Sequence, residues 1–172
     1  MNSADLANDI AATSFLRGLS QRQIEILASC ACRTHFDEGQ IVFRQGETAN
    51  RFYLIEEGGV VLVAATDSGE RTIVAGSIAP GGVLGWSWLF PPYEWQFTAR
   101  ASSATKAIFF YATVLREHFE GDPALGYELF KRMAAEMVKR LQSARRRLLE
   151  SNSGFSPVGG EHPISARRDL AI

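Results

Sequence analysis

The sequence predicts a mainly β protein with flanking helices: a double-stranded β-helix, or jelly roll, preceded by helices and followed by a long dimerisation helix. Short β-rich runs separated by glycine turns fill the middle of the chain, and their spacing of roughly 8–12 residues is typical of jelly rolls and sandwiches. Apolar residues at helical spacing occur on both sides of this region. No helical pattern alternates with the β-rich runs, so a parallel α/β sheet is not expected.

Length and composition indicate one globular domain. The chain has 172 residues, a net charge of -1, 46% hydrophobic residues and 22% charged residues, which are ordinary values for a globular protein. No apolar run approaches the roughly 20 residues of a membrane span, and the polar start is unlike a secretory signal. We expect a cytoplasmic protein with a flexible N-terminus over residues 1–11, a folded domain over 12–150 and a disordered tail over 151–172.

The N-terminal helix is predicted from a cap and a periodic face. Ser20 is a preferred N-cap residue, and Ile24, Leu27 and Ala28 follow it at helical spacing. These signals predict a helix over residues 21–31. The β-rich runs that follow are residues 41–43, 52–55, 60–63, 72–74, 97–101 and 106–110.

Two helices are predicted after the β region. The first covers residues 113–120, and the second covers 123–150, because Asp122 is a good cap and Pro123 suits the first helical position. We expect the first half of the long helix to lie on the β domain through Leu125, Leu129 and Met133. A heptad pattern also predicts a homodimer seam on this helix, which consists of Phe130, Ala134, Met137, Leu141, Ala144 and Leu148.

A glycine-bounded strand carries the first resemblance to a known family. Residues 46–58 read Gly-Glu-Thr-Ala-Asn-Arg-Phe-Tyr-Leu-Ile-Glu-Glu-Gly, in which two glycines permit tight turns around an apolar strand. This pattern, and the Phe-Asp-Glu-Gly sequence of residues 36–39, resemble the cyclic-nucleotide-binding domain of the Crp/Fnr type. The resemblance covers residues 12–150 and implies a jelly roll that serves as a regulatory sensor.

All three tryptophans of the chain fall in a segment that resembles the phosphate-binding cassette of that family. Leu84 and Gly85 open the segment, Leu89 takes its aliphatic position, and Thr98, Ala99 and Ala101 fit its closing strand. The resemblance implies a glutamate that binds ribose and an arginine that binds the cyclic phosphate. Here aromatic residues replace four positions of the cassette: Trp86 the glutamate, Trp88 a small residue, Trp95 the arginine and Phe97 an alanine.

These replacements argue against cyclic AMP or cyclic GMP as a ligand bound in the family's manner. A partly buried phosphate without a paired cation loses roughly 1.5–3 kcal/mol per missing charge-assisted hydrogen bond. Arg100 does not compensate, because strand alternation from Ala99 directs it outward. The family's helix contact to the nucleotide base falls near Ser143. We therefore expect no cofactor, although the resemblance implies a cyclic nucleotide.

Two interpretations of the aromatic cassette remain open. In the first, Trp86, Trp88, Trp95 and Phe97 fold inward and fill the barrel. In the second, the segment binds a planar or apolar small molecule, with contributions from the ligand-site candidates Ser87 and Gln96. Residual binding of a cyclic nucleotide in a displaced pose is a lesser alternative.

The function that we expect is a stand-alone, non-enzymatic regulatory sensor that forms a homodimer. A protein-interaction adaptor with a filled pocket is the alternative. A metal enzyme is not expected, because His35, His118 and His162 are dispersed and no β-rich run carries a cluster of metal ligands. Residues 151–172 are too few for a helix-turn-helix domain, so we expect no DNA-binding domain and no membrane partner.

Overall fold

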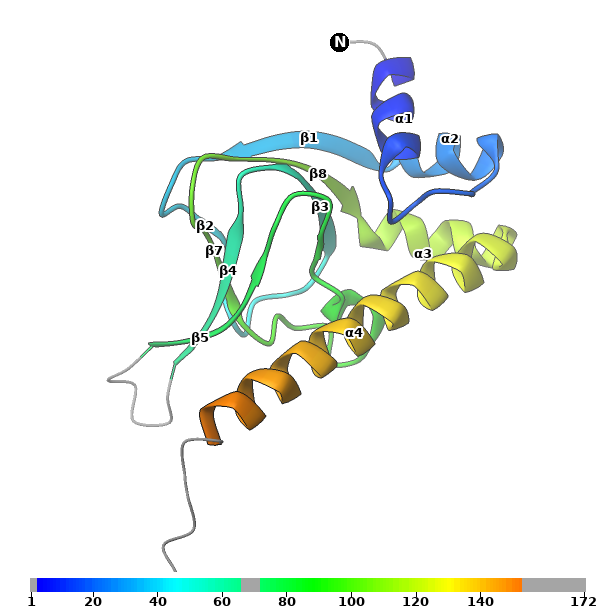
Figure 1. Ribbon diagram of the computed structural model, residues 1–172. Coiled ribbons are helices and arrows are strands. Elements are labelled where there is room, and N and C mark those ends of the chain that lie inside the picture. The colour runs from blue at the N-terminus through cyan, green and yellow to red at the C-terminus, as the bar shows by residue number, and fades with distance from the viewer. Residues whose placement is uncertain (1–2, 66–71, 153–172) are drawn as a thin grey trace, which may run out of the picture. The chain divides into compact units, whose positions relative to one another are not determined.

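The computed structural model describes residues 3–65 and 72–152 (Figure 1). The chain divides into two units, Met1–Val138 and Lys139–Ile172. The first unit contains both β sheets and the core, and the described part of the second consists of the last turns of a long helix. The tail that we predicted to be disordered lies outside the described residues, apart from Ser151 and Asn152, which are helical.

The described strands form two antiparallel sheets of four strands each, which confirms the predicted jelly roll (Figure 1). The first sheet has the order β1-β8-β3-β6. Its strands are β1 (Ala31–Phe36), β8 (Thr105–Tyr111), β3 (Arg51–Glu57) and β6 (Val83–Leu84). The second sheet has the order β2-β7-β4-β5. Its strands are β2 (Ile41–Phe43), β7 (Thr98–Ala101), β4 (Val60–Ala65) and β5 (Thr72–Ile78).

Strand β1 lies outside the β-rich runs that the sequence pattern delimits. It pairs with β8 along its whole length, from Ala31 opposite Phe110 to Phe36 opposite Thr105. This pairing draws Ala31 into the sheet, so the preceding helix α2 (Gln21–Ser29) ends two residues before the predicted residue 31. Half of the β1 residues are polar and the strand shows weak alternation, because its position depends on a partner that lies far along the chain.

The described part of the N-terminal segment, for which we expected flexibility over residues 1–11, is helical from Ser3. Helix α1 spans Ser3–Ala12. Ile10 on this helix is fully buried, and Leu6 and Ala7 pack against the same core. Asp9 forms an ion pair with Arg33 of β1. Leu6 and Ile10 are four residues apart, so they share one face of α1 and provide the burial that holds it.

The predicted cap of α2 is confirmed. The Ser20 hydroxyl accepts a hydrogen bond from the backbone N–H of Gln23 at 3.3 Å, and the Gln23 side chain accepts one from the Ser20 N–H at 3.0 Å. This reciprocal pair is a capping box, which satisfies two N–H groups that the helix itself leaves unbonded.

The C-terminal helices also begin as predicted. Helix α3 spans Ala112–Gly121, and α4 spans Pro123–Asn152. The Asp122 carboxylate accepts a hydrogen bond from the Leu125 N–H at 3.1 Å, as an N-cap residue does. In the first unit, Leu125, Leu129 and Met133 are fully buried in the core, which confirms that the first half of α4 covers the β domain.

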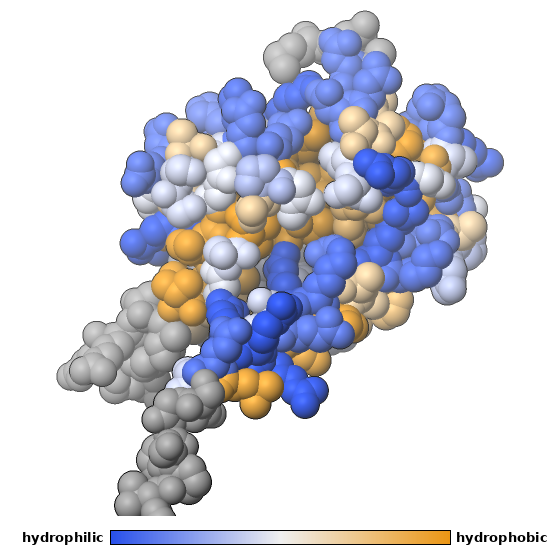
Figure 2. All heavy atoms as spheres, viewed as in Figure 1, coloured by the Kyte–Doolittle hydropathy of each residue, from blue (hydrophilic) through white to orange (hydrophobic). Residues whose placement is uncertain are grey.

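On the face seen in Figure 2, hydrophilic residues cover much of α1, and apolar residues are visible among the strands. No helix among the described residues is long and apolar enough to cross a membrane.

Candidate functional site

The cassette starts with a backbone turn that only glycine adopts readily. Strand β6 ends at Leu84, and Gly85 follows with φ of 85°, a left-handed conformation that is costly for residues with a Cβ. A 3₁₀ helix, η1 (Ser87–Leu89), comes next. The frame predicted from the sequence, a glycine followed by a short helix, is therefore present.

Trp95, which we expected at the position of the family's arginine, lies against this glycine. Its side chain is 4% exposed, and its ring stacks on Phe43 of β2 with centroids 3.8 Å apart and an interplanar angle of 12°. A Cβ built on Gly85 would lie 2.7 Å from Cζ3 of Trp95. The indole thus fills the space next to the Gly85 backbone.

The backbone of Trp95 is fixed to the turn that opens the glycine-bounded strand. Its N–H donates to the Glu47 carbonyl at 2.9 Å, and its carbonyl accepts from the Gly46 N–H at 2.9 Å. This two-bond clamp resembles one rung of an antiparallel ladder. The indole is consequently held by both its ring contacts and its main chain.

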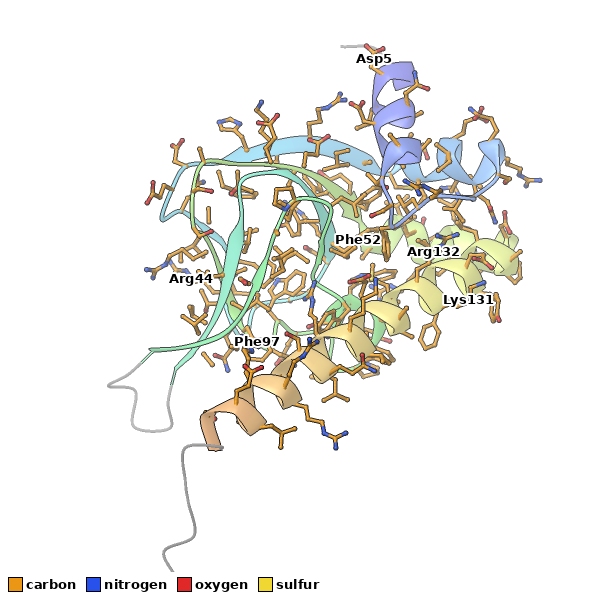
Figure 3. All side chains as sticks on the ribbon, in the orientation of Figure 1. Asp5, Arg44, Phe52, Phe97, Lys131 and Arg132 are labelled. Atoms are coloured by element: carbon orange, nitrogen blue, oxygen red, sulfur yellow. The ribbon has the colours of Figure 1, made fainter. Side chains whose placement is uncertain are left out.

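Trp88 lies on the opposite side of the first sheet, so this ring does not fill the barrel as the first of the two interpretations has it. Tyr53 faces the second sheet, because its ring is 6.1 Å from that of Phe43; alternation then directs Phe52 away from the second sheet. Trp88 stacks on Phe52 at 5.8 Å and contacts Phe119 of α3 at 6.2 Å. Figure 3 shows Phe52 on the side of β3 that faces the helices.

The short 3₁₀ helix explains why the two tryptophans diverge. Trp88 is fully buried within η1, whose turn directs its ring to the helix side of the sheet. Trp95 follows a loop that returns the chain to the space between the sheets. The helix-side cluster continues from Phe52 to Phe110, whose rings stack at 4.4 Å.

The loop between these tryptophans contacts both C-terminal helices. Tyr93 has φ of 59°, and its ring lies 4.8 Å below the guanidinium of Arg116 on α3. Arg116 also donates to the Trp88 carbonyl at 3.4 Å. Phe90 meets Phe130 of α4 edge to face, with centroids 6.1 Å apart. The segment 90–93 is therefore tied to α3 and α4.

The remaining predicted site residues are less buried. Trp86, Leu89 and Phe97 are partly buried against the core (Phe97 is labelled in Figure 3), and Ser87 is half-buried. Gln96 is exposed, as is Ser143 in the second unit. The structure therefore brings Trp95 to Gly85, whereas Gln96 lies outside the buried part of the cassette.

The closing strand follows the predicted alternation. Ala99 and Ala101 of β7 are buried, and Arg100 between them is exposed. Arg100 pairs across the ladder with Ile41 and Val61. The exposure of Arg100 confirms the outward direction that we predicted for its side chain.

Aromatic residues surround Tyr53 between the sheets. Its ring centroid lies 6.2 Å from that of Phe36 and 6.1 Å from that of Phe109. Burial raises the pKa of the Tyr53 phenol, and the nearby positive charge of Arg51 opposes that rise in part. The phenol therefore keeps its proton at neutral pH and can donate a hydrogen bond.

Arg51 is a cation near the cassette that the sequence analysis did not select. Its guanidinium lies 4.8 Å from the ring centroid of Phe109 and 5.4 Å from that of Tyr111. Its backbone carbonyl is 3.4 Å from the Cβ position built on Gly85. The family pattern permits any residue at this position of the strand, so the sequence motif carried no signal for it.

The described residues contain no group of three or more His, Cys, Asp or Glu side chains that could hold a metal ion. The candidate site is built from aromatic rings, backbone groups and the guanidinium groups of Arg51 and Arg116.

Residues 33–122 match the cyclic nucleotide-binding domain family. A putative cyclic nucleotide-binding protein from Geobacter metallireducens has a similar structure (TM-score 0.70, 28% identity, 78% of this chain and 97% of the other). The regulatory subunit of a cAMP-independent protein kinase A from Trypanosoma cruzi, bound to guanosine, has a similar fold (TM-score 0.65, 18% identity, 87% of this chain and 51% of the other).

Part of the chain is also similar in sequence to a curated protein. The cAMP-dependent protein kinase regulatory subunit of Dictyostelium discoideum is 34% identical over 59 residues, which are 34% of this chain and 18% of the relative. The match thus spans less than a fifth of that protein. Together, the jelly roll, the glycine-led cassette and the match over residues 33–122 confirm the predicted resemblance, and the chain belongs to the cyclic nucleotide-binding domain family.

Proposed function

We propose that this protein is a non-enzymatic regulatory sensor whose altered cassette does not bind cyclic AMP or cyclic GMP in the family's manner. The observation that supports this most directly is the position of Trp95. Its ring is buried between Phe43 and the Gly85 backbone, at the place in the cassette where the family has a phosphate-binding arginine.

The chemistry of an indole is unsuited to a cyclic phosphate. An indole offers one neutral N–H donor, whereas a guanidinium offers a charged fork that matches phosphate oxygens. Trp86 likewise cannot accept hydrogen bonds from ribose hydroxyls as a glutamate does. Loss of both polar contacts weakens binding by about 10²–10⁴-fold.

The aromatic lining favours a ligand with a planar body. The rings of Phe36, Phe43 and Phe109 each lie within contact distance of the Tyr53 ring. Aromatic faces bind flat ligands by stacking. The Trypanosoma cruzi protein was determined bound to guanosine, a nucleoside that has a planar base and no phosphate.

The test of this proposal is a titration with cyclic AMP and cyclic GMP, followed by tryptophan fluorescence and calorimetry. We expect no saturable response below millimolar nucleotide. The matched variant carries Trp86→Glu and Trp95→Arg, which restore the family's two polar residues, and we expect it to gain affinity. Micromolar binding by the wild-type protein would contradict the proposal.

We further propose that the sensor is a homodimer formed through α4. In the first unit, Phe130 of the predicted seam is 49% exposed, and in the second unit Leu141 and Leu148 are 70% and 64% exposed. Exposed large apolar residues that repeat at heptad spacing are typical of a helix that pairs with another.

A charge placed on the seam tests the dimer. Leu141→Glu should convert the protein to a monomer in analytical ultracentrifugation, whereas Gln142→Glu adds the same charge one residue away and should leave the dimer intact. A wild-type protein that stays monomeric at high micromolar concentration would exclude the homodimer and favour an adaptor whose helix binds another protein.

A further inference from the structure

Arg51 occupies an unusual place for a positive charge. It pairs with Tyr111 in the β3–β8 ladder, two residues before Tyr53, so its side chain shares the face of β3 that is directed toward the second sheet. The register of Tyr53 with Leu84 places Arg51 next to the first residues after β6. Arg51 therefore lies at the cassette end of the space between the sheets.

The surroundings of Arg51 are aromatic. Its guanidinium lies over Phe109 and near Tyr111, whose rings meet edge to face with centroids 5.1 Å apart. Cation–π contacts use the flat face of the guanidinium. Its N–H groups lie in the guanidinium plane, and the guanidinium is hydrogen-bonded to the Tyr53 side chain there.

The charge of Arg51 has no carboxylate partner among the described residues, where the ion pairs involve other side chains. Its Nε is buried and has no hydrogen-bond partner within that part of the chain. A buried charged donor without an acceptor is costly. The arrangement is thus complementary to an acceptor with a negative charge.

We infer that Arg51, Phe109 and Tyr111 form a binding site for a small planar organic anion. The guanidinium donates hydrogen bonds to the carboxylate or phosphate group of the ligand. The planar ring of the ligand stacks on the ring of Tyr111, which is 39% exposed. The inference rests on the proposed sensor function and names a ligand class for it. The cation that binds the anion belongs to β3, whereas the cassette has Trp95 where the family has its arginine.

Calorimetric titration with benzoate, phenyl phosphate and neutral benzamide tests the site. We expect an anion to bind more tightly than benzamide, and Arg51→Met to weaken its binding by about 10–100-fold, as the loss of a charge-assisted hydrogen bond predicts. Comparison of benzoate with phenyl phosphate distinguishes a carboxylate ligand from a phosphate ligand. The matched control is Arg100→Met, because Arg100 is exposed on the outer face of β7.

Several results would overturn the inference. They are failure of both anions to bind at millimolar concentration, equal binding of benzamide, and an unchanged affinity in Arg51→Met. If Arg51→Met does not fold, Arg51→Lys decides the matter: it retains the charge but lacks the planar fork, so its affinity should lie several-fold below that of wild type, and an unchanged affinity would contradict the inference.

The two proposals fail in different ways. Micromolar binding of cyclic AMP would contradict the altered cassette, whatever the result with benzoate. Binding of benzoate that does not depend on Arg51 would contradict only the anion site.

Discussion

The ring of Trp95 lies nearly parallel to that of Phe43, with centroids 3.8 Å apart and an angle of 12° between the planes. Phe43 belongs to β2, whereas Trp95 belongs to the cassette, so the stack joins the cassette to the second sheet. The cassette therefore contains a buried ring, Trp95, that packs on Phe43 and has no charge with which to bind a ligand.

Gly85→Ala should destabilise the protein more than a comparable glycine change elsewhere. Gly81→Ala is the matched control, because Gly81 has φ of 81° and no atom within 4 Å of its Cβ position. The control should cost about 1 kcal/mol of unfolding free energy through backbone strain. Gly85→Ala should cost about 1–3 kcal/mol more, because its Cβ meets the Trp95 ring. Equal costs in urea unfolding would show that Trp95 moves aside freely.

Trp88 should tolerate phenylalanine far better than alanine. Its ring is fully buried against Phe52, so Trp88→Ala should cost about 3–5 kcal/mol of unfolding free energy. Its Nε1 has no hydrogen-bond partner among the described residues, and Trp88→Phe removes this N–H while a ring remains. We expect a cost of about 1–2 kcal/mol for that change. Similar losses in the two variants, measured by chemical denaturation, would contradict this account.

Stability should fall at alkaline pH through Tyr53. Burial raises the pKa of its phenol above the ordinary value of 10.0, so the folded state retains the proton more tightly than the unfolded chain. This contribution to stability is complete below pH 10 and is lost as the pH rises through the folded pKa. Tyr53→Phe should therefore reduce the alkaline loss of unfolding free energy, whereas Tyr127→Phe, at a residue that is 65% exposed, should not.

The alkaline experiment needs one background substitution. Burial also raises the pKa of the Cys30 thiol above its ordinary value of 9.0, and this group destabilises the fold in the same direction as the pH rises. Measurement of both tyrosine variants in a Cys30→Ala protein isolates Tyr53. If the unfolding free energy of Tyr53→Phe then falls with rising pH as much as that of the Cys30→Ala parent, the buried phenol makes no contribution to the alkaline loss of stability.

Arg116→Met should loosen the cassette loop. The guanidinium of Arg116 contacts both the Tyr93 ring and the Trp88 carbonyl, so its removal leaves residues 86–93 with fewer attachments to α3. We expect several-fold faster amide hydrogen exchange across those residues, measured by mass spectrometry. Arg100→Met serves as the control, and equal protection in the two variants would show that Arg116 does not hold the loop.

Elements with local signals were predictable from the sequence. Ser20 and Asp122 act as caps because their side chains accept hydrogen bonds from N–H groups three residues ahead. Such contacts between residues close in the chain can be recognised from the sequence. The alternation of Ala99, Arg100 and Ala101 was likewise predicted, because the strand period fixes which side chains point inward.

Features that depend on long-range pairing were missed. Strand β1 exists because β8 lies beside it, and the direction of Trp88 follows from a 3₁₀ turn whose geometry the sequence does not specify. Arg51 gained its aromatic neighbours only through the β3–β8 register. Residues separated by about 60 positions meet there, so no local motif indicates the contact.

Phe130 belongs at once to the predicted seam and to the contact with Phe90 of the cassette loop. A partner helix that covers Phe130 therefore also changes the environment of Phe90. If a ligand shifts the loop and thereby strengthens dimer formation by some factor, dimer formation must strengthen ligand binding by the same factor, because the two equilibria share one free-energy cycle. In the proposed dimer, the edge-to-face pair of Phe90 and Phe130 would be the contact that makes ligand occupancy depend on the protein's concentration.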